Sequence, residues 1–250
     1  TELMVKEWKI SREAQDQLAF ESHQKGAKGY DEGFYDDLVM DFQGIKRDGI
    51  LRKETTLEKL AKLKPAFDKS ASGTLTAGNS TPLTDGAAAV LLASDDWAKK
   101  KNISPLAYLV DVESAALNFV RGPGRRAEGL LMAPTIAVAR LLARNNLKLQ
   151  DFDFYEIHEA FAGQVLSTLK AWEDPAYCKK RLGLDAPLGS IDRSKMNIKG
   201  GSLAMGHPFA ATGGRIIMNL AKILSQRGSG RGLISICTGG GMGIAAILER

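Results

Sequence analysis

Residues 197–214 restrict the possible folds more than any other part of the chain. Their sequence is Asn197-Ile198-Lys199-Gly200-Gly201-Ser202-Leu203-Ala204-Met205-Gly206-His207-Pro208-Phe209-Ala210-Ala211-Thr212-Gly213-Gly214. The histidine in this run, His207, lies directly before a helix that the sequence predicts over 211–227. Its glycines let the backbone approach a ligand closely, and its proline stiffens the loop. Because the positive end of a helix favours a neutral imidazole, His207 is a candidate to accept a proton or donate one hydrogen bond. A structural loop histidine is the alternative.

A second glycine-rich run follows an apolar stretch near the end of the chain and reads Cys237-Thr238-Gly239-Gly240-Gly241-Met242-Gly243. A cysteine at the tip of a strand, followed by glycines, places a thiol beside exposed backbone N–H groups. Such a thiol can act as an acid or base next to an oxyanion site. The alternative is a buried core cysteine before a flexible hairpin, which is common for cysteine in general.

The third run, Glu156-Ile157-His158-Glu159-Ala160-Phe161-Ala162, lies at a predicted junction between a strand and a helix. Open α/β sheets bind ligands at such junctions, where strands end at their carboxyl termini. His158 and Glu159 are therefore candidate site residues. The alternative for Glu159 is a cap in the first turn of the following helix, where a carboxylate is favourable whatever the function.

The remaining sequence alternates predicted helices and strands, which indicates an α/β fold. A helix begins after Ser11 and ends where Gly26 and Gly29 occur. Residues 29–53 and 173–196 are expected to be irregular, the second as a loop insertion. The other expected helices lie near 57–64, 95–102 (capped by Ser94), 134–146 (begun by Pro134) and 159–172, and the helix over 211–227 has one apolar face. The expected strands are 87–92 (buried), 105–117, 152–157, 233–237 and 244–248.

Composition is that of an ordinary globular protein: the chain has 250 residues, of which 44% are hydrophobic and 25% are charged. No apolar run approaches the roughly 20 residues of a membrane helix, and no signal pattern opens the chain, so we expect a soluble protein. The net charge of +5 suits an anionic ligand. The basic clusters 99–101 and 125–126 are interpreted as solvated surface. Two cysteines without ligand spacing predict neither a disulfide framework nor a metal site, and favour a reducing compartment.

Taken together, the three runs resemble the C-terminal signatures of the thiolase family, and the chain is similar to thiolases throughout its length. The block 72–92, with Thr76-Ala77-Gly78-Asn79 and Asp85-Gly86-Ala87-Ala88, also resembles a thiolase signature. His158 stands where many thiolases have asparagine. With Gly206-His207-Pro208-Phe209, it makes the chain more similar to the β-subunit of the trifunctional fatty-acid oxidation complex and its bacterial relatives.

The resemblance implies an acetyl-CoA C-acyltransferase with two catalytic cysteines and one histidine. It assigns the histidine to His207 and the second cysteine to Cys237, whereas no segment here resembles the region of the nucleophilic first cysteine. Cys178 is no substitute, because its sequence neighbours are polar and it falls in a variable loop of the family. We therefore expect His207 and Cys237 to lie close together, facing His158, at one end of the sheet, and the chain alone to be inactive.

The implied reaction is cleavage of a 3-ketoacyl-CoA by CoA, or the reverse condensation. His207 takes the proton of the missing cysteine's thiol, the resulting thiolate attacks the 3-keto carbon, and Cys237 protonates the departing enolate. His207 and a water positioned by His158 stabilise the enolate oxygen, and the N–H of Gly239 contributes to a second oxyanion hole. The resemblance places Gly78 and Thr81 near the pantetheine arm of CoA. CoA is the substrate, and no cofactor or metal is implied.

The family fold consists of two α/β halves with mixed sheets sandwiched by helices, and here the N-terminal half is largely missing. The resemblance assigns 1–70 to the end of an inserted loop domain, 71–103 to the last elements of the N-terminal half, and 104–250 to the C-terminal domain. The implied partners are acyl-CoA, CoA, the missing N-terminal half and further copies in a homo-oligomer, with a fatty-acid oxidation complex as another candidate. The implied location is the cytoplasm, or the mitochondrial matrix in a eukaryote.

Three alternatives stay open. A ketoacyl synthase shares the fold but uses a Cys-His-His or Cys-His-Asn site, and Cys237 in its glycine-rich turn argues against it. A non-catalytic scaffold of thiolase type fits the absent nucleophile, although the retained His207 and Cys237 do not require that interpretation. Nucleic-acid binding rests on net charge alone, and we expect no such partner.

Overall fold

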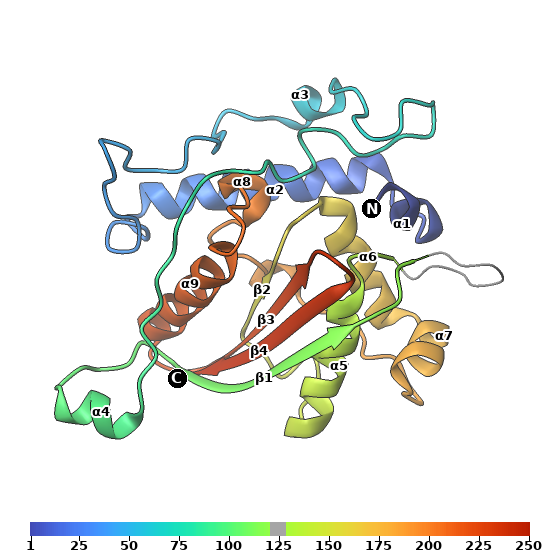
Figure 1. Ribbon diagram of the computed structural model, residues 1–250. Coiled ribbons are helices and arrows are strands. Elements are labelled where there is room, and N and C mark those ends of the chain that lie inside the picture. The colour runs from blue at the N-terminus through green and yellow to red at the C-terminus, as the bar shows by residue number, and fades with distance from the viewer. Residues whose placement is uncertain (121–128) are drawn as a thin grey trace.

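The core of the protein is one mixed four-stranded sheet in the order β1-β4-β3-β2 (Figure 1). The computed structural model describes residues 1–120 and 129–250. The middle strand β4 is antiparallel to both β1 and β3, whereas β2 is parallel to β3, as an α/β crossover requires. The strands are β1 (Tyr108–Ala116), β2 (Phe154–Ile157), β3 (Arg231–Thr238) and β4 (Met242–Glu249). The predicted α/β class is confirmed.

Helices cover both faces of this sheet because successive strand residues point to opposite sides. On β3, Leu233 packs into the cluster that contains α5 (Ala133–Asn145) and α6 (Ala162–Glu173). Its neighbour Ile234 packs into the cluster formed with α9 (Thr212–Arg227). These three helices agree with the predicted ones to within a few residues, and α5 begins with the expected proline near its first position.

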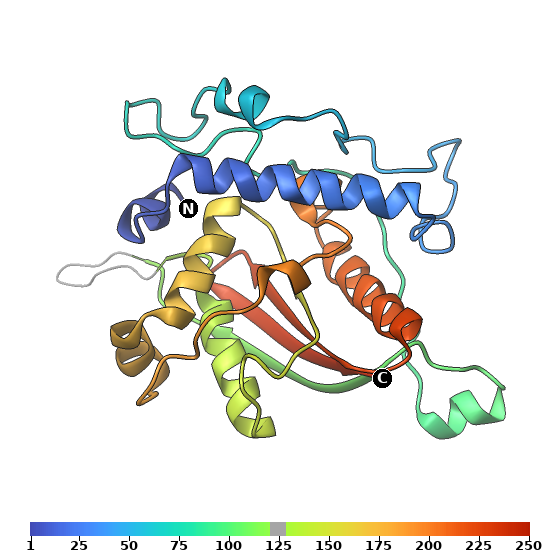
Figure 2. The same ribbon diagram turned by 180° about the vertical axis from the view of Figure 1, so that it is seen from behind.

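The long helix α2 (Arg12–Asp31) runs above the ends of β2 and β3, as both views show (Figures 1 and 2). The hydroxyl of Ser11 caps it, as predicted, by accepting from the N–H of Ala14. The predicted end at Gly26 and Gly29 is wrong, because both glycines lie inside the helix. They serve close packing instead: a Cβ at Gly26 would lie 3.1 to 3.5 Å from neighbouring side chains, two of them on α8 (Ser202–Met205).

The segment 173–196 contains short helical turns rather than the loop that the sequence predicts. They are α7 (Pro175–Tyr177), a π-helical turn (Cys178–Leu182) and a 3-10 turn (Arg193–Lys195). The interpretation of Cys178 as lying in polar surroundings is also wrong. Its side chain is fully buried, and Sγ donates to the backbone carbonyls of Ala171 and Trp172. The thiol therefore closes the end of α6, which is a structural role.

The predicted buried strand at 87–92 is wrong, because this segment is extended but largely exposed and has no regular secondary structure. Leu91 and Leu92 are 72% and 67% exposed, since no strand among the described residues pairs with them. The outer strand β1 likewise exposes Val110 and Val112. Apolar side chains of both segments therefore face solvent.

The remaining elements lie at the periphery. They are α1 (Glu2–Glu7), α3 (Leu57–Ala61) and α4 (Asp95–Lys100), the last of which projects away from the body in Figure 1. The lysines at 99–101 are exposed, as predicted, whereas the cluster 125–126 lies outside the described residues. Across the described part of the chain, no helix combines the length and apolar character needed to cross a bilayer.

The contact between α2 and the loop before α8 generates a stability prediction. A Cβ at Gly200 would lie 2.7 Å from the backbone of Gly26, and its φ is +85°. Gly183 has a similar φ of +70° but open space around it. Both substitutions by alanine carry the cost of a left-handed backbone, whereas Gly200→Ala adds overpacking of about 1–3 kcal/mol. Thermal unfolding should show a clearly lower midpoint for Gly200→Ala than for Gly183→Ala, and equal midpoints would contradict the close packing.

The exposed apolar side chains generate a prediction about the state of the protein in solution. A patch of this kind favours association. We expect the 250-residue chain on its own not to be a stable free monomer, but to aggregate or to bind further polypeptide, including copies of itself. Size-exclusion chromatography with light scattering measures this. A monodisperse species of about 27.0 kDa with a cooperative melt would refute the expectation.

Candidate active site

Two histidines meet at the edge of the sheet where β2 and β3 end. His158 directly follows β2, and its backbone N–H extends the parallel ladder by donating to the carbonyl of Ser235 on β3 at 2.9 Å. His207 follows α8, and its backbone N–H donates to the carbonyl of Pro82 at 3.0 Å. The centroids of the two imidazole rings are 4.4 Å apart. The structure therefore brings together two predicted site residues that are far apart in sequence.

The surroundings of His207 define its protonation. Its Nδ1 lies 2.7 Å from Oγ1 of Thr212, and that hydroxyl donates its single proton to the carbonyl of Pro208 at 3.1 Å. Oγ1 is therefore the acceptor at Nδ1, so Nδ1 carries the proton and Nε2 is a bare acceptor. Burial, and then the charge of Arg215, lower the pKa of His207. The ring is neutral and can take up a proton at Nε2.

His158 is held more deeply. Its Nδ1 lies 2.9 Å from Oγ of Ser202, while Nε2 is buried and has no hydrogen-bond partner among the described residues. Burial, followed by the proximity of His207 and Arg215, lowers the pKa of His158 to about 3. The ring is therefore neutral at physiological pH, and Nε2 is available to a bound water or ligand.

Glu159 is a structural anchor. The helix α6 begins only at Ala162, so the proposed capping of its first turn is wrong. The buried carboxylate instead accepts from the side chains of Ser22 and Asn197 and from the backbone N–H of Leu203 in α8. Three donors make this burial tolerable. The carboxylate fixes α2, the 197 loop and α8 around the residue that follows His158.

Glu156 lies two residues before His158 on β2 and is buried, with 3% exposure. Burial, and then the nearby Glu159, raise the pKa of Glu156 to about 8, although Arg215 and Lys25 oppose the shift. The carboxyl group is thus largely protonated at neutral pH. The sequence identified neither its burial nor its protonation, because the residue reads simply as part of a strand end.

Cys237 lies near the end of β3, beside the segment that carries His158. Its side chain is 4% exposed and packs in a cluster that includes Leu131, Met132 and Ala160. Burial raises the pKa of the Cys237 thiol to about 12. The thiol is therefore protonated, which suits a proton donor better than a nucleophile. The ring contacts of His207 are with His158 and Phe209. The expected approach of Cys237 to His207 stays a prediction.

Gly239 opens the turn between β3 and β4, and a Cβ there would meet open space. Its position, two residues after Cys237, leaves its backbone accessible, as the proposed oxyanion role needs. Gly78 packs against Leu60 and Leu63, which a Cβ would approach to 2.7 and 2.6 Å. The hydroxyl of Thr81 donates to the carbonyl of Ser202 at 2.6 Å. The CoA contacts assigned to Gly78 and Thr81 stay predictions. In the structure both residues contribute to packing or hydrogen bonding within the chain.

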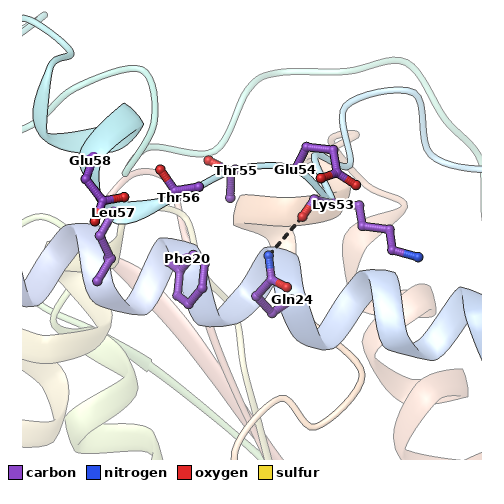
Figure 3. A pocket seen from close by; sticks show the side chains of 8 residues that line it. All are labelled: Phe20, Gln24, Lys53, Glu54, Thr55, Thr56, Leu57 and Glu58. Atoms are coloured by element: carbon purple, nitrogen blue, oxygen red, sulfur yellow. Dashed lines mark hydrogen bonds between the residues drawn. The ribbon is translucent and has the colours of Figure 1, made fainter.

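Two cavities lie away from the paired histidines. One of about 350 Å³ is formed by Phe20 and Gln24 of α2 and by the segment 53–58, where Gln24 Nε2 donates to the carbonyl of Lys53 (Figure 3). The other, of about 720 Å³, is bordered by Trp8 and Tyr177. Within residues 1–120 and 129–250, no group of three or more acidic, histidine or cysteine side chains is arranged to hold a metal ion.

The sequence did not identify the residues that control the two rings. Thr212 and Arg215 lie in the first turns of α9 and look like ordinary helix residues in the sequence. Ser202 is the first residue of the short helix α8. Thr212 could have been suspected from its position, because it is a polar residue five positions after His207 on the helix that this histidine precedes. Ser202 and Arg215 touch across the α8–α9 connection, which one sequence alone does not show.

Comparison with known proteins identifies the family of the chain. Residues 1–96 match the family described as "Thiolase, N-terminal domain", and residues 105–250 match "Thiolase, C-terminal domain". The chain belongs to the thiolase family. Because both domains are matched, this thiolase chain is not confined to the C-terminal domain, while the predicted boundaries at 70 and 103 stay predictions.

Curated relatives of this thiolase include a 3-ketoacyl-CoA thiolase of Pectobacterium carotovorum, 42% identical over 99% of this chain and 56% of the relative. A 3-ketoacyl-CoA thiolase of Yersinia enterocolitica is 41% identical over the same shares. Among solved structures, the acetyl-CoA acetyltransferase of Bacillus anthracis superposes with a TM-score of 0.80 at 35% identity, covering 99% of this chain and 58% of that one. Human mitochondrial 3-ketoacyl-CoA thiolase in complex with CoA gives 0.79 at 34%, covering 99% and 57%. The chain thus spans little more than half the length of these relatives.

The buried Glu156 of this thiolase generates a pH prediction. Between pH 6.5 and 8 the folded chain keeps a proton on Glu156 that the unfolded chain, with an ordinary pKa of 4.5, has released. Because the folded state binds more protons, stability should fall as pH rises through this window, by up to about 1.4 kcal/mol per unit. The lowered histidine pKa values act in the opposite sense only below about 6.5.

The measurement is the midpoint of thermal unfolding at several pH values. The decline between pH 6.5 and 8 should be reduced in Glu156→Gln and retained in Glu21→Gln, a matched change at a partly exposed residue of α2. Parallel pH profiles for wild type and Glu156→Gln would show that Glu156 is ionised in the folded state.

Proposed function

We propose that this chain is part of an enzyme that cleaves 3-ketoacyl-CoA with CoA, giving acetyl-CoA and a shortened acyl-CoA, or runs the reverse condensation. The observation that carries the proposal is the pair of His158 and His207, one with a bare Nε2 and both neutral. The buried, protonated thiol of Cys237 on β3 supports it. The same chain is 42% identical to a protein named 3-ketoacyl-CoA thiolase. Its net charge of +5 suits the anionic CoA.

The first step needs a nucleophilic thiolate from outside these 250 residues. The chain's two cysteines are Cys178, buried and bonded to backbone carbonyls, and Cys237, whose pKa is raised. The external thiol attacks the 3-keto carbon and transfers its proton to Nε2 of His207. That nitrogen is the bare acceptor of a neutral ring, as the step demands.

Carbon–carbon cleavage then expels the enolate of acetyl-CoA, which needs a proton at its α-carbon. Cys237 supplies it, because a buried thiol keeps its proton until a strong base such as an enolate is present. The incoming CoA then attacks the acyl-enzyme, with Cys237 or His207 accepting its thiol proton. In the condensing direction Cys237 removes the α-proton instead.

Oxyanion stabilisation uses the same groups. The protonated His207, with a water held by Nε2 of His158, stabilises the enolate oxygen of the thioester. The backbone N–H of Gly239 and that of the external cysteine stabilise the second oxyanion. The human mitochondrial relative solved in complex with CoA supports CoA as the shared substrate, with Gly78 and Thr81 of this chain near its pantetheine arm.

The oligomeric state and the location of the enzyme are proposed from its resemblance to the family. The enzyme works as a homo-oligomer that contains the N-terminal half, in the cytoplasm or in the matrix of a mitochondrion. A fatty-acid oxidation complex is the candidate larger assembly, because His158 and Gly206-His207-Pro208-Phe209 match that branch of the family.

The test of this proposal uses the 250-residue chain and the intact enzyme. The purified chain alone should show no thiolysis of acetoacetyl-CoA or a longer 3-ketoacyl-CoA, whereas the intact enzyme should show it. In the intact enzyme, Cys237→Ala should lower turnover by a factor on the order of 100 or more, because the enolate loses its proton donor. Acylation of the nucleophile by acetyl-CoA, read by mass spectrometry, should persist.

Cys178→Ala is the matched control, since it removes the other buried thiol and should leave turnover within a few fold of wild type. Turnover by the rigorously purified chain alone would overturn the need for an external nucleophile. An intact enzyme that lacks thiolysis altogether would overturn the proposed reaction.

A further inference from the structure

Ser202 lies between a permanent cation and one of the two paired histidines. Its side chain is 1% exposed, so solvent does not compete for the hydroxyl. Nη2 of Arg215 donates to Oγ of Ser202 at 2.6 Å, and the same oxygen is 2.9 Å from Nδ1 of His158. The two contacts form a continuous chain from the guanidinium, through the hydroxyl, to the imidazole.

The first hydrogen bond restricts the second, because it occupies one of the two lone pairs of the serine oxygen, and the positive charge of Arg215 then favours one direction. A guanidinium only donates, so one lone pair of Ser202 Oγ is occupied by Arg215. The hydroxyl proton is then free to be donated, and the neighbouring positive charge strengthens it as a donor. The same charge favours a lone pair rather than an N–H at the imidazole nitrogen that faces it. Nδ1 of His158 is therefore the acceptor, and the ring proton resides on Nε2.

Arg215 also connects this chain of contacts to the other histidine. Its Nη1 donates at 2.9 Å to the carbonyl of Gly206, the residue directly before His207. Gly206 has a φ of +82°, and a Cβ there would lie 2.6 Å from Thr84, so the backbone at this point is closely confined. One guanidinium thus holds both the support of His158 and the loop that carries His207.

We propose that Ser202, held by Arg215, is a positioning residue that fixes His158 as an Nε2–H donor. The inference rests on the proposed function, because it assigns how that reaction's histidine pair is prepared. His207 has its proton on Nδ1 and presents a bare Nε2, whereas His158 presents an N–H at Nε2. The pair offers a ligand one acceptor and one donor, on rings whose centroids are 4.4 Å apart. Thr212 and Ser202 set the two tautomers.

A consequence distinguishes positioning from general structural support. An asparagine at 158 has an amide whose donor needs no tautomer, so Ser202 has nothing to select once His158 is replaced. The cost of removing the hydroxyl should therefore depend on which residue occupies position 158. A purely structural hydroxyl would give the same cost with either residue.

Kinetics of the intact enzyme test this with a double-mutant cycle. Ser202→Ala should lower kcat for thiolysis on the order of 10- to 100-fold, with the KM for CoA little changed, because the oxyanion water loses an oriented donor. In the His158→Asn background the same change should alter kcat by less than about twofold. Ser202→Thr, which keeps the hydroxyl, should remain within about threefold of wild type.

Ser167→Ala is the matched control, because it removes another buried hydroxyl, one bonded to the carbonyl of Gly163 within α6. It should leave kcat unchanged. Equal losses from Ser202→Ala in the two backgrounds would overturn the positioning role and leave Ser202 as structural support.

Imidazole ¹⁵N shifts of the intact enzyme, with labelled histidine, decide the inference without any assay of turnover. We expect His158 to be protonated at Nε2 in wild type and to become a mixture of tautomers in Ser202→Ala. Protonation at Nδ1 in wild type would overturn the inference. If the enzyme fails to cleave 3-ketoacyl-CoA, the proposed function fails, while these shifts still report on Ser202.

Discussion

The buried carboxylate of Glu159 joins three segments that are far apart in the sequence. It accepts from Ser22 of α2, from Asn197 in the loop before α8, and from the N–H of Leu203. Burial raises its pKa, while these donors favour the charged form and keep it in place. Because Glu159 is the next residue after His158, the same anchor that closes α2 over the sheet also determines where that imidazole points.

Two chemically identical side chains acquire different roles through different neighbours. His207 donates a hydrogen bond from Nδ1–H to Oγ1 of Thr212, and that hydroxyl donates its own proton to a backbone carbonyl. His158 instead faces a hydroxyl already bonded to Arg215. Burial lowers the pKa of both rings, so neither carries a resting charge that would repel the other at a centroid separation of 4.4 Å. The environment of each nitrogen, rather than the residue type, separates acceptor from donor.

The sequence predicted the elements whose causes are local. Caps at Ser11 and Ser94, the proline near the start of α5 and the apolar face of α9 are all legible within a few residues, and all were confirmed. The errors arose where a distant contact overrides a local signal. Gly26 reads as a helix end but provides space for α8, and 87–92 reads as a buried strand but lacks a neighbouring strand in the described chain. Likewise, the run around His207 was recognisable, whereas the Ser202–Arg215 contact depends on tertiary packing.

The burial of Cys237 limits the chemistry that this half of a thiolase can perform. A thiol with a pKa near 12 is a poor nucleophile at neutral pH but retains a proton for a carbanion that needs one. The nucleophile has the opposite requirement, a thiolate stabilised by positive charge or by a base such as Nε2 of His207. The proposed reaction therefore needs two thiols in unlike surroundings. The apolar cluster around Cys237 provides one of those environments, and a helix start or a neighbouring base has to provide the other. Separate segments for the two cysteines follow from that electrostatic conflict.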